Sequence, residues 1–233
     1  MSIRRWVRGL ALPGVALMIG CAGEEGNSAP ADTPPAAEDA AGAPAPPTVL
    51  FLGTSLTAGP GIDPADAYPA LIQARIDSAG LPFRVVNAGS SGETSAGALR
   101  RLEWLLRQPF DVLVLETGAN DMLNGVPVDS IRANLQRIID RVRRERPNAQ
   151  IVLVGMLAMP NLGREYGEEF GALYPGLARE NGLPLVPFLL EGVGGVPALN
   201  LPDGIHPNEA GHRRVAATVW RTLEPVLRAR APA

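Results

Sequence analysis

The residues best suited to catalysis are a serine, a histidine and an aspartate that lie in two distant segments. His206 belongs to "DGIHPNEAGH" (203–212), and Asp203 stands close enough before it to accept a hydrogen bond from its Nδ1–H. Ser55 lies within "GTSLTAG" (53–59), a small polar cluster that directly follows an apolar run. A serine hydroxyl needs an adjacent base to act as a nucleophile near neutral pH. These three residues are therefore a candidate Ser-His-Asp arrangement.

Several of these residues also have a structural interpretation. Ser55 can be an ordinary turn residue, and Asp203 can cap the helix that follows it. His212, the second of the chain's two histidines, lies more than a helical turn further along, and we interpret it as structural. The rival serines Ser90 and Ser91 lie in a flexible-looking "GSSG", and the chain contains no G-x-S-x-G elbow.

Short apolar runs that alternate with helical patterns must position these residues. The runs are 48–53, 83–88, 110–116, 150–157 and 183–188. Their nearly continuous apolar character is typical of strands buried on both faces of a parallel sheet. Helical spacing of apolar residues predicts helices over 129–146 and about 207–228, with Pro207 in the first turn of the second.

This alternation predicts an α/β fold, a three-layer α/β/α sandwich around a central, mainly five-stranded parallel sheet. In such sheets ligands bind beyond the carboxyl ends of the strands. We therefore expect the loops that directly follow the strands to carry the chemistry.

The N-terminal segment predicts export from the cytoplasm. Arginines followed by an apolar run predict a signal peptide over 1–20, since a membrane-spanning helix needs roughly 20 apolar residues. The run ends in "LMIGC", which resembles the lipobox of bacterial lipoproteins and makes Cys21 the candidate lipidation site. Residues 21–47, rich in Pro, Ala and acid, are expected to form a disordered tether, and 48–233 one domain.

We therefore expect a protein anchored through Cys21 in the periplasm of the bacterial envelope, at the outer rather than the inner membrane. The alternative is an ordinary signal peptide with an incidental cysteine, which would give a soluble secreted protein.

Composition excludes several kinds of chemistry. Cys21 is the only cysteine and the chain has no lysine, so the domain has no disulfide, cysteine nucleophile, Ser-Lys dyad or P-loop lysine. The formal net charge is -3, and nothing suggests a nucleic-acid partner. We expect neither a metal nor a cofactor, and no obligate protein partner is evident.

Four sequence blocks together resemble the SGNH (GDSL-type) hydrolase superfamily. They are 53–59, "NAGSSGETSAG" (87–97), "ETGAND" (116–121) and 203–212, in that order. The segment 161–193 resembles the bacterial branch of thioesterases, lysophospholipases and arylesterases in particular. The resemblance implies a flavodoxin-like sandwich and a serine-dependent hydrolase of acyl esters, lysophospholipids or acyl thioesters.

The resemblance also implies roles for individual residues. Ser55 matches the family nucleophile, His206 the general base and then acid, and Asp203 the residue that orients that histidine. Gly92 matches the glycine whose N–H faces the oxyanion, and Asn120 the side-chain donor to the same oxygen. The N–H of Ser55 would complete this oxyanion hole.

The chain departs from the family pattern at several positions. Thr54 stands where an aspartate is common, and we expect activity to be retained with altered loop rigidity or pKa. Thr117, Met122 and Asn124 replace more usual residues where acyl-group preference can change. Glu93 and Asp121 are interpreted as structural acids that order their loops.

The substrate and the alternatives remain open at this point. The apolar loops 156–163 and 193–202 either line an acyl pocket or serve only packing and connection. One alternative function is a carbohydrate-ester deacetylase of the same fold. The other is a non-catalytic envelope binding protein that retains the sandwich.

Overall fold

The computed structural model describes residues 45–231. The predicted signal peptide (1–20), Cys21 and nearly all of the predicted tether (21–47) lie outside the described residues. None of the helices within 45–231 combines the length and the apolar character that crossing a membrane requires.

The described residues form one five-stranded parallel sheet, as predicted, and its strands lie in the spatial order β2-β1-β3-β4-β5. The strands are β1 (Thr48–Gly53), β2 (Arg84–Gly89), β3 (Val112–Glu116), β4 (Gln150–Val154) and β5 (Leu185–Val186). All residues of β1 and β3 are buried, because these central strands are covered on both faces. Their continuous apolar sequence is the pattern that such burial requires.

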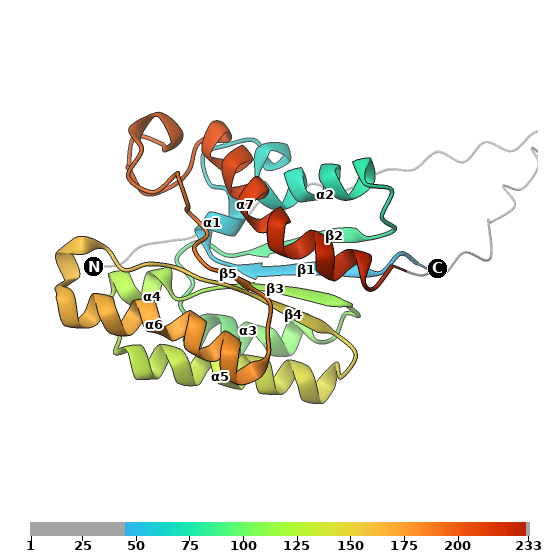
Figure 1. The fold of residues 1–233 in the computed structure, drawn as a ribbon, viewed down its shortest axis with the longest axis horizontal. Helices are drawn as coiled ribbons and strands as arrows, with labels where there is room; N and C mark the ends of the chain where they lie inside the picture. The colour runs from blue at the N-terminus through green and yellow to red at the C-terminus, as the bar shows by residue number, and fades with distance from the viewer. Residues whose placement is uncertain (1–44, 232–233) are drawn as a thin grey trace, which may run out of the picture. The chain divides into compact units, whose positions relative to one another are not determined.

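Helices cover both faces of the sheet, which confirms the three-layer α/β/α sandwich. Figure 1 shows α2 and α7 on one face and α3, α5 and α6 on the other. The helices are α1 (Ser55–Ala58), α2 (Tyr68–Ser78), α3 (Ser95–Leu105), α4 (Ala119–Leu123), α5 (Val128–Glu145), α6 (Arg164–Asn181) and α7 (Glu209–Arg228). Short 3₁₀ helices lie at η1 (Pro64–Asp66), η2 (Pro160–Leu162) and η3 (Pro197–Leu199).

Several sequence-based boundaries differ from the structure, such as the run 150–157, whose strand β4 ends at Val154, and two of the differences have a clear local cause. The run 183–188 forms only the two-residue β5, because Pro184 and Pro187 flank it and lack the N–H that a sheet requires. The last helix begins at Glu209, since the Asn208 side chain accepts the Gly211 N–H at 3.0 Å and acts as its N-cap. Pro207 therefore precedes the helix instead of lying in its first turn.

The strand order reverses at β1, and this reversal positions the site. From β1 the chain crosses to β2 on one side and then returns to β3 on the other. The loops that follow β1 and β3 consequently diverge, which opens a crevice at their carboxyl ends. The short helices α1 and α4 begin just beyond these two strands (Figure 1).

Candidate active site

Ser55, His206 and Asp203 lie together at the carboxyl end of the sheet. The Nε2 of His206 is 2.9 Å from the Oγ of Ser55, and its Nδ1 is 2.7 Å from the Oδ2 of Asp203. One carboxylate therefore orients the imidazole while its other nitrogen faces the hydroxyl. This geometry is that of a serine activated by a histidine base.

The acidity of Asp203 suits this arrangement. Its side chain accepts hydrogen bonds from the His206 ring and from the backbone N–H groups of His206 and Ile205, which lower the pKa of Asp203 to about 2. The carboxylate therefore stays ionised at neutral pH and holds the Nδ1–H tautomer of His206. Asp203 does not cap α7, because Asn208 fills that position.

The turn that presents Ser55 is sterically tight. β1 ends at Gly53, where an added Cβ would lie 2.0 Å from the Oγ1 of Thr57, so only glycine fits. Ser55 is then the first residue of α1, and helix-starting N–H groups have no intrahelical acceptor. The backbone N–H of Ser55 is therefore not used by the helix.

The loop that carries His206 is fixed by backbone pairing. The N–H of Leu201 donates to the carbonyl of His206 at 2.7 Å, and Asn200 pairs with Pro207 in an antiparallel bridge. The buried Asn200 side chain also donates to the carbonyls of Val193 and Val196, both at 2.8 Å. This loop thus projects the imidazole from just before α7 toward α1.

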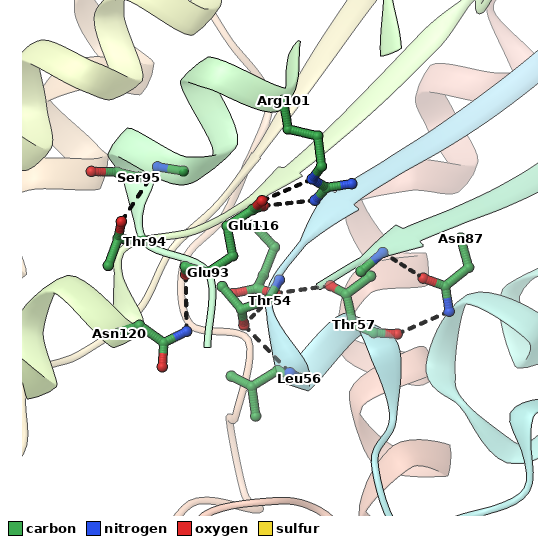
Figure 2. A network of polar contacts seen from close by, with 12 residues as sticks. Thr54, Leu56, Thr57, Asn87, Glu93, Thr94, Ser95, Arg101, Glu116 and Asn120 are labelled. Atoms are coloured by element: carbon green, nitrogen blue, oxygen red, sulfur yellow. Dashed lines mark hydrogen bonds and ion pairs between the residues drawn. The ribbon is translucent and has the colours of Figure 1, made fainter. Parts of the chain in front are cut away.

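The two further oxyanion candidates come from neighbouring loops. Gly92 has φ of 75°, and a Cβ there would meet no atom within 4 Å, so the backbone conformation and not crowding favours glycine. The Nδ2 of Asn120 donates to the carbonyl of Glu93 at 2.9 Å (Figure 2). A side-chain amide has two N–H groups, so one remains for a substrate oxygen.

The predicted structural acids tie these loops together. Glu93 pairs with Arg101 at 2.6 Å, and Asp121 accepts the N–H and the hydroxyl of Ser95 at 2.7 and 2.6 Å. Asp121 directly follows Asn120 in α4, so its bonds to the start of α3 hold the two oxyanion candidates in adjacent positions.

His212 contacts the start of α2, whereas the histidine that contacts Ser55 is His206. The buried ring of His212 accepts the backbone N–H of Tyr68 at 3.1 Å through Nδ1, and burial lowers the pKa of His212 to about 4. A neutral ring is required for this contact, which agrees with a structural interpretation.

The rival serines lie elsewhere on the same edge. Ser90 and Ser91 line a hollow of about 500 Å³ together with Gly92, Arg100 and other loop residues. Both ring nitrogens of His206 already face Ser55 and Asp203, so this histidine is not the base for either rival serine.

Exposed apolar side chains gather on the segments that follow the strands. We call five of them the apolar rim: Leu123, Leu157, Met159, Val196 and Ile205. Among residues 45–231 only one other large apolar side chain is exposed, Trp104 on α3. The loops 156–163 and 193–202 therefore contribute Leu157, Met159 and Val196 to a surface at the site's end of the sheet.

Glu116 is a further residue of the site to which the sequence pattern assigned no role. It is the last residue of β3, is fully buried, and accepts hydrogen bonds from Thr54 and Thr57 on either side of Ser55. The available signal was an acidic residue that ends an otherwise apolar strand, "VLVLE".

A Ser-His-Asp arrangement at the carboxyl edge of an α/β/α sandwich is the site of a serine hydrolase. Residues 51–214 match the GDSL-like Lipase/Acylhydrolase family, and the chain belongs to that family. It is 41% identical over 181 residues to Esterase TesA of Pseudomonas aeruginosa, covering 77% of this chain and 89% of that protein.

Two further similar proteins are also named as enzymes that hydrolyse esters or thioesters. The chain is 39% identical to Thioesterase 1/protease 1/lysophospholipase L1 of Escherichia coli over 182 residues, which cover 77% of this chain and 85% of that protein. The crystal structure of the psychrotrophic esterase EstA from Pseudoalteromonas sp., inhibited by monoethylphosphonate, superposes with a TM-score of 0.73 at 30% identity, covering 78% of this chain and 98% of that chain.

Proposed function

We propose that this protein hydrolyses acyl esters through a covalent acyl-enzyme on Ser55. The observation that carries the proposal is the continuous contact from Asp203 through His206 to Ser55, at 2.7 and 2.9 Å. Membership of the GDSL-like Lipase/Acylhydrolase family supports the same chemistry.

The reaction follows from this contact. The Oγ of Ser55 bonds to the substrate carbonyl carbon while the Nε2 of His206 takes the hydroxyl proton, and the carbonyl electrons move onto the oxygen. Collapse of this tetrahedral intermediate breaks the bond to the leaving group, which receives the proton from His206. Water then attacks the acyl-enzyme by the same route, which releases the acid and restores Ser55.

Three donors are proposed to stabilise the oxyanion. They are the backbone N–H groups of Ser55 and Gly92 and the second N–H of the Asn120 amide. Donors fixed before the reaction stabilise charge that develops in the transition state without reorganising.

The substrate class we propose is an ester or thioester with an apolar acyl chain, such as a lysophospholipid. The apolar rim supports this choice, because exposed apolar side chains around a site favour contact with a hydrocarbon chain over a sugar. The relatives, an esterase and a thioesterase/lysophospholipase by name, also support an acyl ester or thioester substrate.

Hydrolysis of p-nitrophenyl esters of increasing acyl length by the full chain tests the function. We expect turnover that falls about 10⁴-fold or more in Ser55→Ala, because removing the nucleophile leaves only the residual catalysis of the site. Equal rates in the two folded proteins would exclude the serine mechanism. Turnover of acetyl esters alone, together with acetylated sugars, would favour the deacetylase.

We also propose that Cys21 carries a lipid that anchors the enzyme to the periplasmic face of a bacterial membrane. The support is the lipobox-like "LMIGC" after an apolar run. Expression with labelled fatty acid should label the wild-type protein and leave Cys21→Ser unlabelled and in the soluble fraction. An unlabelled wild type would favour an ordinary signal peptide.

A further inference from the structure

The carboxyl group of Glu116 is the polar centre beneath the turn that presents Ser55. The side chain leaves the end of β3 and reaches the neighbouring β1–α1 turn (Figure 2). Its Oε2 accepts the backbone N–H of Thr54 at 2.8 Å, the Thr54 hydroxyl at 3.0 Å and the Thr57 hydroxyl at 2.8 Å. The residue is 1% exposed, so bulk solvent does not reach these contacts.

The residues that Glu116 holds flank Ser55 in the chain. Thr54 precedes Ser55, and Thr57 lies one helical position beyond Leu56 in the four-residue α1. So short a helix has little stability of its own, since isolated helices of one turn are unfavourable. The orientation of Ser55 therefore depends on the contacts that fix its two threonine neighbours.

The network continues away from the site into the helices on one face of the sheet. The Thr57 hydroxyl lies 2.8 Å from the hydroxyl of Tyr68, and the Tyr68 N–H donates to His212. Tyr68 lies in α2 and His212 in α7, so a chain of contacts that starts at one carboxyl group of β3 connects α1, α2 and α7. A buried carboxyl group is costly unless hydrogen bonds satisfy it, so this cost favours the one arrangement that supplies its donors.

Thr54 is matched to this acceptor. Its hydroxyl donates to Glu116 and can also accept the N–H of Leu56, at 3.4 Å, at the start of α1. In this chain an aspartate at position 54 would place a second carboxyl group against Glu116, whereas threonine supplies a proton. The departure from the common family residue is thus accommodated by Glu116.

We propose that Glu116 is a positioning residue for hydrolysis, which holds Thr54 and Thr57 and thereby aims the Oγ and the N–H of Ser55 at His206 and the substrate carbonyl. This inference rests on the proposed function of Ser55. Glu116 does not touch the reacting atoms and acts only through its two threonine partners.

Replacement of Glu116 by glutamine in the full chain tests the proposal. Glutamine preserves the size but has only one acceptor oxygen, so its NH₂ group must take the place of one carboxylate oxygen and face a threonine hydroxyl that donates there. We expect kcat per active serine, titrated with a p-nitrophenyl phosphonate, to fall about 10–100-fold, because small displacements of reacting groups cost about that much. KM should remain within about twofold, since the residue does not contact the acyl chain.

The matched control is Asp111→Asn. Asp111 precedes β3 and accepts the N–H of Thr48 at 2.7 Å, which is the equivalent contact at the opposite end of the same two strands. We expect this variant to lose thermal stability while kcat stays within about twofold of wild type. A loss of kcat as large as that of Glu116→Gln would show a general effect of destabilisation and would overturn the proposal.

Variants of Thr54 give a second, independent measurement. Thr54→Val removes the hydroxyl and should lower kcat, whereas Thr54→Ser keeps it and should retain most of the rate. In the double variant, the fold-losses of kcat from Glu116→Gln and Thr54→Val should not multiply. The two substitutions disrupt the same contact, the one between the Thr54 hydroxyl and the Glu116 carboxyl group. If Glu116→Gln does not fold, the kcat values of Thr54→Val and Thr57→Val test the positioning role instead, since both variants retain the carboxyl group of Glu116.

Two negative outcomes are distinguishable. A wild type without Ser55-dependent turnover would overturn the proposed function and this inference with it. An active wild type, with folded Glu116→Gln and Thr54→Val whose kcat is unchanged, would overturn only the positioning role.

Discussion

The two ends of the parallel sheet use the same kinds of side chain for different purposes. At the amino ends, Asp111 joins the start of β3 to Thr48 of β1, and Arg146 donates to the carbonyls of Leu106 and Gln108. These are contacts between side chains and backbone that close the ends of elements. At the carboxyl ends, Glu116 is buried beside the turn of Ser55, and His206 connects Ser55 to Asp203.

The difference follows from topology. At the carboxyl ends of β1 and β3 the chain diverges to opposite sides of the sheet, so polar side chains converge without a connection between the strands to cover them. At the amino ends, the segments that lead from the helices into the strands are held by ordinary hydrogen bonds to the backbone. The comparison predicts that substitutions at the carboxyl edge change rate, whereas substitutions at the amino edge change stability.

After the loss of the nucleophile in Ser55→Ala, the largest effect at the carboxyl edge is expected for Asn120→Ala. Loss of one oxyanion donor typically lowers kcat about 10²–10³-fold. Ester hydrolysis at saturating substrate measures it, with Asn181→Ala at the end of α6 as the control for loss of an amide. An unchanged kcat in Asn120→Ala would mean that this amide serves only its bond to Glu93.

His212 is expected to be an exception at the carboxyl edge, with an effect on stability. Burial lowers its folded-state pKa from 6.5 to about 4, so the unfolded chain binds more protons between these values. The free energy of unfolding should therefore fall as pH decreases from about 6.5 to 4, by up to about 3 kcal/mol from this group.

Urea unfolding of His212→Asn at several pH values isolates this contribution. The asparagine oxygen can replace Nδ1 as the acceptor for the Tyr68 N–H but does not titrate in this range. The variant should lose less stability than wild type on acidification. Parallel curves for the two proteins would contradict a buried neutral histidine.

A smaller effect on rate is expected at the apolar rim. Leu157→Ser and Met159→Ser should each lower kcat/KM for long-chain esters about 10-fold, because contact with an apolar side chain contributes on the order of 1–2 kcal/mol. Rates on acetyl esters should stay within about twofold. Trp104→Ser, an exposed apolar residue on α3, is the control and should leave the chain-length profile unchanged.

The smallest effect is expected at the amino edge. Arg146→Met removes the donor to the carbonyl of Leu106 and keeps an apolar stem, so the free energy of unfolding should fall by about 1 kcal/mol. Urea unfolding measures this change, and kcat/KM should be unchanged. A drop in kcat/KM beyond about twofold would break the distinction between the two edges.

The sequence by itself determined the elements and the local part of the site. Continuous apolar runs predicted the strands, and the stripe of Ile131, Leu135, Ile138 and Val142 predicted α5, because periodicity reports burial directly. The pair Asp203 and His206 was also readable, since only two residues of one loop lie between them. The two-residue β5 was predicted too long, because the flanking prolines remove N–H groups that an apolar pattern does not reveal.

Only the tertiary structure decided which distant side chains meet. Glu116 reads as the end of a strand, and its partner Thr54 lies 62 positions earlier in the chain. His212 likewise faces Tyr68, 144 positions away, instead of the nearer His206. Such contacts depend on the spatial order of the strands and on how the helices pack against them, and the spacing of residues within a short segment does not reveal either. The sequence therefore determined the chemical groups available at the carboxyl edge, and the packing around Glu116 decided how Ser55 is presented there.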